Sequence, residues 1–236
     1  HLVLPFGTKY EIDGPLVIGN DYTRIVGCRG VLETENDPPI TIADGSAPAV
    51  VLVGFAASVP VHIKTERTVV LDRMDVGARY GGTVLVESGG KVFLENTATD
   101  IRVKHPAARV WMRHFNHEHK SMALTVDAGR VWVLGWKSEN LHQRVRQTGG
   151  EVEILGFQSY EVGRDKAGDT PIFEILGGRF SAAGLAQHGR TKHQVLIREQ
   201  RGNAAQLLTA ENNADRHDCA LCTAYPVKDE AAENEQ

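Results

Sequence analysis

Apolar positions recur at a fixed interval of 21 residues through the middle of this chain. Residues 109–118, 130–139 and 151–160 align without a gap, and each segment alternates apolar with polar positions. One column holds Val110, Val131 and Val152, a second holds Met112, Val133 and Ile154, and a third holds Phe115, Trp136 and Phe157. A period near 20 in residues that favour β-structure predicts a solenoid, in which each unit buries its apolar face against its neighbours.

Earlier parts of the chain carry the same apolar strand, and each copy ends at a bend. The bends fall at positions 27, 54, 73, 96, 114, 135 and 156. A second class of short strand closes on a glycine turn between the bends, at residues 40–45, 84–90, 124–129 and 172–178. Strands without connecting helices predict an all-β, right-handed parallel β-helix with coils of about 21 residues. A two-sheet sandwich with strands every 8–12 residues is the alternative, and the ungapped columns favour the helix.

The repeat sets the expected boundaries. We predict a parallel β-helix over residues 1–200, followed over 201–236 by a cap strand, at residues 220–227, and a polar tail. The chain opens on His1 with no initiator Met and no signal peptide. We therefore expect a fragment of a longer protein, with a missing N-terminal domain as one candidate partner.

Composition excludes several classes of function. The formal charge of -4 gives no basic footprint for nucleic acid, and no run of Lys or Arg indicates a membrane surface. No apolar stretch approaches the roughly 18 residues of a membrane span. Phosphate loops, serine nucleophile elbows and dinucleotide fingerprints are absent from the sequence, so no cofactor is expected.

Three segments resemble a known group of proteins. Residues 4–10 are similar to the "LP-x-GTY" entry coil of right-handed β-helix proteins of the pectate-lyase-like superfamily. Residues 111–118 and 134–139 resemble segments of bacterial pectate-lyase-superfamily and polygalacturonase-related proteins. The resemblance covers residues 1–200 and implies an extracellular or periplasmic protein whose partner is a polysaccharide. Because the fold hosts hydrolases, lyases, epimerases and adhesins, a non-catalytic scaffold or carbohydrate-binding portion remains the alternative to an enzyme.

Strand alternation predicts which side chains point outward. With Val131 and Val133 inside, Trp132 points out, and beyond the bend Lys137 and Glu139 do the same. Phe93, Trp111 and Trp132 then form an external strip of aromatic rings, which we call the aromatic strip. It could stack against sugar rings, or it could be covered by a loop, the tail or another domain.

Glu118 and Glu139 are the predicted catalytic pair. Neighbouring strands lie about 4.8 Å apart, so the two carboxyls could approach to about 5 Å, which is the spacing of a retaining glycosidase. Such proximity is expected to raise the pKa of one of them. The predicted sugar-binding residues are Trp111, Arg113, Asn116, Trp132, Lys137 and Tyr160. The alternatives are a solvated polar ladder, in which Lys137 offsets the two glutamates, and a lyase with Lys137 or Arg113 at its centre.

No metal site is predicted. His117 and His119 could place two imidazoles on one strand face, but without a third ligand we interpret them as surface histidines. Asp72, Asp75 and Asp100 lie too far apart in the sequence to indicate calcium. Cys219 and Cys222 lack a second pair, so we interpret them as small apolar residues of the terminal strand.

Overall fold

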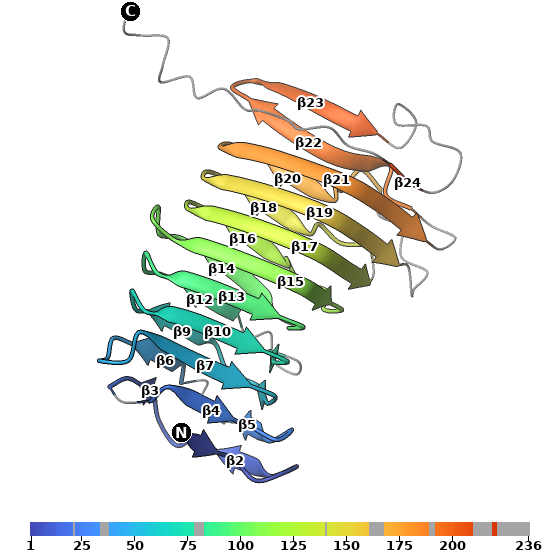
Figure 1. The fold of residues 1–236 in the computed structure, drawn as a ribbon. Helices are drawn as coiled ribbons and strands as arrows, with labels where there is room; N and C mark the ends of the chain where they lie inside the picture. The colour runs from blue at the N-terminus through green and yellow to red at the C-terminus, as the bar shows by residue number, and fades with distance from the viewer. Residues whose placement is uncertain are drawn as a thin grey trace, which may run out of the picture.

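The chain winds into a parallel β-helix of about eight turns, as the 21-residue period predicted (Figure 1). The computed structural model describes residues 1–20, 22–33, 38–77, 83–139, 141–160, 168–188, 192–209 and 219–220. Within these ranges all regular structure is β, with no helix. Nor do they contain a helix long and apolar enough to span a membrane.

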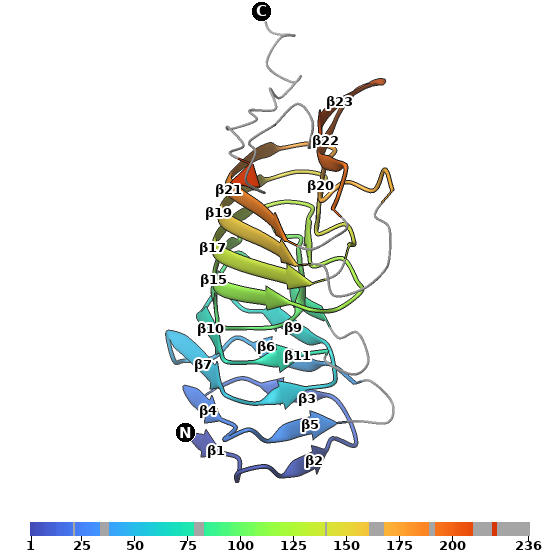
Figure 2. The same ribbon diagram turned by 90° about the vertical axis from the view of Figure 1, so that its right-hand side faces the viewer.

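Three parallel sheets form the walls of the coil. The first contains β1 (Leu2–Val3), β4 (Arg24–Val26), β7 (Ala49–Val53), β10 (Thr68–Asp72), β13 (Lys91–Glu95), β15 (Arg109–His117), β17 (Arg130–Glu139), β19 (Glu151–Tyr160) and β21 (Arg179–His188). The second contains β3 (Leu16–Ile18), β6 (Ile40–Ala43), β9 (Val61–Lys64), β12 (Thr83–Val86), β14 (Asp100–Val103), β16 (Leu124–Val126), β18 (Val145–Gln147), β20 (Phe173–Ile175) and β22 (Val195–Arg201). The third contains β2 (Lys9–Glu11), β5 (Val31–Glu33), β8 (Ala56–Ala57) and β11 (Asp75–Val76). Figure 2 shows the first and second sheets as separate walls.

The last strands break the parallel pattern. β23 (Ala204–Thr209) pairs antiparallel with β22, and β24 (Cys219–Ala220) pairs antiparallel with β21. Of the cap strand predicted over residues 220–227, only Ala220 falls within the described residues. The remainder of that strand and Cys222 lie outside them.

The predicted columns coincide with the observed register. Val110 pairs with Val131 and Val131 with Val152, and all three are buried. Beyond the bend, aromatic rings from successive coils form the core. Ring centroids lie 5.3 Å apart between Phe115 and Trp136 and 5.2 Å apart between Trp136 and Phe157. Edge-to-face contacts of this kind add to the burial of the rings.

Left-handed residues at the corner of each coil turn the chain. Positive φ angles occur at or next to every predicted bend, at Cys28, Arg29, Gly54, Arg73, Asn96, His114, Gly135 and Gly156, and again at Gly184. In this conformation only glycine avoids a steric cost. In each coil the corner divides the strand of the first sheet from the segment that follows it. We call the outward side of these following segments the post-bend face.

Candidate functional site

A column of side chains runs along the post-bend face. Isolated bridges pair Asp75 with Ala98 and Ala98 with Asn116, and the register continues to Lys137 and Gln158. Asp75, Asn116, Lys137 and Gln158 lie on β11, β15, β17 and β19, and Ala98 lies between β13 and β14, so the five residues lie one above another, one strand spacing apart. Apart from Ala98, every member of the column can accept or donate hydrogen bonds.

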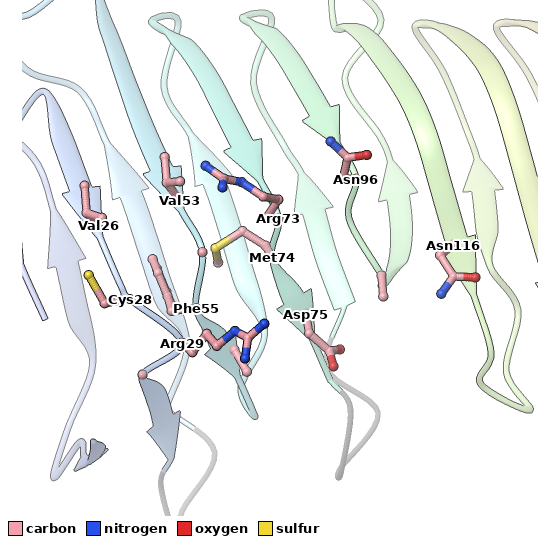
Figure 3. Close-up of a pocket in the computed structure, with 14 residues that line it drawn as sticks. Val26, Cys28, Arg29, Val53, Phe55, Arg73, Met74, Asp75, Asn96 and Asn116 are labelled. Carbon is pink, nitrogen blue, oxygen red and sulfur yellow. The ribbon is translucent and has the colours of Figure 1, made fainter. Parts of the chain in front are cut away.

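The column lines an open groove. One part, of about 710 Å³, is lined by Arg29, Arg73, Asp75, Asn96 and Asn116 among others (Figure 3). A second part, of about 480 Å³, continues from Asn116 past Lys137 and Gln158. The two parts share Asn116 and together cross eight successive coils, from β4 to β21. Seven spacings of about 4.8 Å separate these eight coils, so the groove is about 34 Å long.

Glu118 and Glu139 lie beside this groove and bind the same cation. The Lys137 ammonium is 2.9 Å from Glu118 Oε1 and also hydrogen-bonds Glu139 Oε1. Because both carboxyls reach one nitrogen, they lie well within the ~10 Å span that two-carboxylate glycosidases use. Neither is buried, since the Glu118 side chain is 50% exposed and the Glu139 side chain 23% exposed. The side-by-side placement expected from the repeat is therefore present.

The charge state of Glu118 differs from the expectation. The amide of Asn116 donates to Glu118 Oε1 at 2.9 Å, and this bond, followed by the bond from Lys137, lowers the pKa of Glu118. Like-charge crowding was expected to raise the pKa of one of the two glutamates, but at Glu118 the two donors lower the pKa against the opposing effect of burial. The bonds to Glu139 and Glu118 in turn raise the pKa of Lys137, so this amine stays protonated.

The aromatic strip is present, but on a different surface. Ring centroids are 4.7 Å apart between Phe93 and Trp111 and 5.1 Å apart between Trp111 and Trp132, with nearly parallel planes. The strip lies before the bend, and none of its rings lines the groove. Because Trp111 has a ring stacked on either side, much of its two faces is covered. Its neighbours therefore occupy the surfaces on which a sugar ring would stack.

Two further predicted sugar-binding residues lie at the margins of the site. Arg113 precedes the bend, and its Nε donates to Glu95 Oε2 at 2.6 Å. Tyr160 is exposed and pairs in register with Glu139 on the adjacent coil. Asn116, Lys137 and Tyr160 are thus gathered on the post-bend face, whereas Trp111, Trp132 and Arg113 are not.

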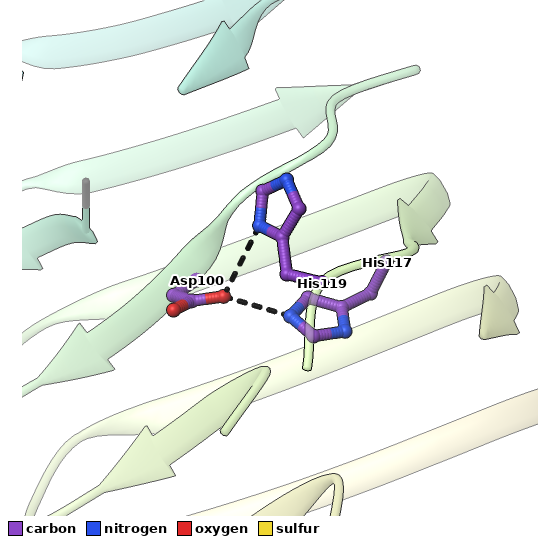
Figure 4. A group of neighbouring side chains, drawn as sticks. All are labelled: Asp100, His117 and His119. Carbon is purple, nitrogen blue, oxygen red and sulfur yellow. Dashed lines mark hydrogen bonds and ion pairs between the residues drawn. The ribbon is translucent and has the colours of Figure 1, made fainter. Parts of the chain in front are cut away.

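A buried polar cluster lies beneath the glutamates, and few features of the sequence indicated it. Arg144 is fully buried and donates from Nη1 to His117 Nδ1 at 2.9 Å and to the His119 carbonyl at 3.1 Å. Its Nη2 donates to the Glu139 carbonyl. A guanidinium can only donate, so Nδ1 of His117 is the acceptor and Nε2 carries the proton. That Nε2–H donates to Asp100 Oδ1 at 2.7 Å (Figure 4).

Charges alternate through this cluster. Burial by itself would raise the pKa of Asp100, but hydrogen bonds from His117 and Ser121 and the nearby His119 outweigh it and hold that pKa well below its usual range. Burial lowers the pKa of His117, and the nearby Arg144 lowers it further. The Asp100 carboxylate, 3.6 Å from His119 Nδ1, raises the pKa of His119. Asp100 is therefore anionic, and the pKa of His119 lies above the usual histidine value whereas that of His117 lies below it.

The interpretation of both histidines as surface residues is wrong for His117. Its side chain is fully buried, because it occupies an inward position of β15 in register with Ser138. The alternation that turned Ser138 inward applies equally to His117, so this signal was present in the sequence. The contribution of Arg144 and Asp100 was not, since both come from other strands and loops.

This cluster fits a metal ion poorly. Ligand atoms of Asp100, His117 and His119 lie within 4.8 Å of one another, which is close enough for a shared cation. Coordination through His117 Nε2 needs a lone pair there, yet Arg144 already uses the lone pair on Nδ1. The guanidinium also adds positive charge next to the cluster. Asp72, considered above for calcium, pairs instead with Arg73 at 3.1 Å.

Asp75 is the groove residue that sequence reasoning left without a role. Its Oδ1 is buried and has no hydrogen-bond partner among the described residues. Burial raises the pKa of Asp75, His119 opposes this effect and Glu118 adds to it. Asp75 therefore lies near both His119 and Glu118.

Comparison with known proteins assigns no family, since no family model, curated protein or solved structure matches the chain. The function has to be argued from the groove and from the charged residues beside it.

Proposed function

We propose that this protein is a carbohydrate-active β-helix of the pectate-lyase-like kind that hydrolyses an extended polysaccharide. The observation that carries the proposal is a groove that crosses eight coils and is about 34 Å long, with Glu118 and Glu139 beside it. Ligand sites are concave surfaces with a few convergent polar groups, and this groove has that character along its whole length.

Polymer recognition follows from the repeat of the coil. Asp75, Asn116, Lys137 and Gln158 place donors and acceptors along one line, with Asn96 beside them. A chain of repeating sugars presents hydroxyl groups at regular intervals, and the regularly spaced donors and acceptors of the groove match these groups. Binding energy spread over many coils also positions one glycosidic bond next to the glutamates.

Hydrolysis suits the charges better than β-elimination. A lyase needs a base to take the proton next to a uronate carboxyl, but the raised pKa of Lys137 keeps this amine protonated. Glu118, held ionised by Asn116 and Lys137, suits attack on an anomeric carbon or stabilisation of its positive charge. Glu118 and Glu139 both bond the Lys137 ammonium, so their carboxyls are close enough to act on one glycosidic bond.

The test uses a panel of polysaccharides and two readouts. Release of reducing ends reports hydrolysis, and absorbance of unsaturated uronates reports elimination. For Glu118→Gln and Glu139→Gln we expect turnover to fall by about 100-fold or more with polysaccharide affinity retained. Glu87→Gln is the matched control, because Glu87 pairs with Lys64 at 3.6 Å and lines neither part of the groove. Full turnover in both groove variants would contradict the proposal.

A non-catalytic carbohydrate-binding scaffold is the second candidate. The observation in its favour is Lys137, which neutralises both glutamates as it would in a solvated polar ladder. In that case the wild-type chain binds a polysaccharide in the groove without releasing either product. Lys137→Met would then weaken binding, and neither glutamine variant would have turnover to lose.

A further inference from the structure

We propose that His119 is the proton donor of the groove, held by Asp100 and positioned through the buried Arg144. The inference rests on the proposed hydrolytic function and deepens it, with His119 rather than Glu139 giving the proton and Glu139 holding the Lys137 ammonium beside Glu118. Lys137 hydrogen-bonds both glutamates, and together with Asn116 it lowers the pKa of Glu118. Cleavage of a glycosidic bond nevertheless needs one protonated acid beside an ionised carboxylate.

One ring nitrogen of His119 lies close to Asp100, and the other points away from it. Its Nδ1 is buried and lies 3.6 Å from Asp100 Oδ1. The side chain as a whole remains 21% exposed, and Figure 4 shows its second ring nitrogen directed away from Asp100. A general acid needs this arrangement, because one nitrogen fixes the ring and the other meets the substrate.

The surroundings favour the protonated imidazole. Asp100, Asp75 and Glu118 all act to raise the pKa of His119, and only burial opposes them. The remaining neighbours in the cluster are His117, which is neutral, and Arg144, whose charge is directed toward His117 and two backbone carbonyls. Asp75 also lines the groove, so the His119 ring lies near the groove wall.

Arg144 and Ser121 are positioning residues for His119. Ser121 Oγ donates to Asp100 Oδ1 at 2.8 Å, and the His117 Nε2–H fixed by Arg144 donates to the same oxygen. Both bonds keep Asp100 anionic and oriented. Arg144 also binds the backbone carbonyls of His119 and Glu139, so one buried guanidinium ties the proposed donor to the strand that carries the glutamates.

The chemical step balances with these groups and water. Nε2–H of His119 gives its proton to the glycosidic oxygen as the bond from that oxygen to the anomeric carbon breaks. The Glu118 carboxylate forms a bond to that carbon, and the leaving sugar departs as an alcohol. A water molecule then gives a proton to the neutral His119 and displaces Glu118, which restores both groups.

The experiment compares His119→Asn with His62→Asn in the full chain. His62 lies on the outer face of β9, 3.7 Å from Glu87 and outside the groove lining, so it is the matched control. We expect His119→Asn to lower polysaccharide turnover by about 100-fold or more at unchanged affinity, and His62→Asn to leave turnover unchanged. The wild-type rate should fall as pH rises through the pKa of His119, and this alkaline limb should be absent in His119→Asn.

A titration of the His119 ring by NMR provides a readout that does not depend on turnover. We expect the pKa of His119 to lie above that of a free imidazole in the wild type and to fall in Asp100→Asn. Ser121→Ala is the milder variant, since it removes one bond to Asp100 and leaves the carboxylate in place, and it should lower that pKa by a smaller amount.

The outcomes separate the two proposals. If wild-type protein cleaves a polysaccharide and His119→Asn cleaves it equally well, the proton-donor assignment is overturned and the hydrolytic function stands. If wild-type protein cleaves nothing in the panel, the proposed function fails and the role of His119 as a catalytic acid fails with it. A pKa of His119 at or below that of free imidazole, or one that does not change in Asp100→Asn and Ser121→Ala, overturns the contact that holds the donor.

Discussion

Asp100 shows how one buried carboxylate can organise a site. It accepts hydrogen bonds from His117 and Ser121 and pairs with His119, so three partners from one segment converge on a single oxygen. A buried charge is tolerated only with such partners, and removing the charge leaves the donors without an acceptor. The cluster therefore contributes to stability as well as to the proposed chemistry.

We expect Asp100→Asn to lower the free energy of unfolding at pH 7 by about 3 kcal/mol. The folded-state pKa of Asp100 is depressed below the ordinary value of 3.8, so its ionised form stabilises the fold above that pH. This contribution is lost as pH falls through the folded-state pKa, and the difference between wild type and variant should narrow below about pH 4. Urea unfolding of the wild type and of Asp100→Asn at several pH values measures this difference in unfolding free energy.

Asp127→Asn is the control for that comparison. Asp127 forms a more exposed ion pair with Arg102 at 2.8 Å, and a surface pair contributes about 1 kcal/mol or less. If Asp127→Asn and Asp100→Asn lowered the free energy of unfolding equally at neutral pH, the Asp100 cluster would contribute no more stability than a surface ion pair.

The corner of the coil is the element on which the groove depends. The long strands β15, β17, β19 and β21 pass through a left-handed residue and continue with their alternation reset. Because of this reset, the aromatic strip faces one side and the glutamates another. His114 occupies the corner of β15 with φ 51°, whereas Gly135 occupies the next corner with φ 74°.

Gly135→Ala is expected to destabilise the fold by about 1–2 kcal/mol, because a side chain at positive φ approaches the following carbonyl. A Cβ at Gly135 would meet only His114 Cδ2 at 3.8 Å, so crowding adds nothing to this cost. Denaturant unfolding measures it, with Gly14→Ala as the control, since that glycine has no positive φ and no atom within 4 Å of its would-be Cβ. A Gly135→Ala variant as stable as Gly14→Ala would mean that the corner is not strained.

Over the whole molecule, each coil is stabilised mainly by the coils next to it. Middle coils have neighbours on both sides, and their aromatic core residues Phe115, Trp136 and Phe157 are buried. In the N-terminal coil, Val3 is 61% exposed and Phe6 is 75% exposed. Stability should therefore vary along the stack.

Amide hydrogen exchange is expected to reveal this gradient. Amides of β1, β2 and β3 should exchange faster than those of β15, β17 and β19, because opening an end coil breaks one interface whereas opening a middle coil breaks two. Exchange followed by mass spectrometry on the folded chain measures the difference. Uniform protection from β1 to β19 would contradict the nearest-neighbour picture and indicate one global unfolding unit.

The 21-residue repeat by itself determined the coil, the register of Val110, Val131 and Val152, and the outward direction of Lys137 and Glu139. It could do so because strand alternation and nearest-neighbour stacking depend only on local sequence, and the same pattern recurs in every repeat. The same alternation turns His117 inward, although a lone histidine is read more readily as a surface residue.

Only the tertiary structure decided the chemistry around those positions. Arg144 and Asp100 reach His117 from other coils, and no periodic column of the sequence contains either contact. The pKa of Glu118 depends on the short distances to Asn116 and Lys137, whose hydrogen bonds lower it against the effect of burial. Hydrogen bonds and pKa values depend on the arrangement of individual side chains in three dimensions, whereas the coil depends only on the apolar pattern.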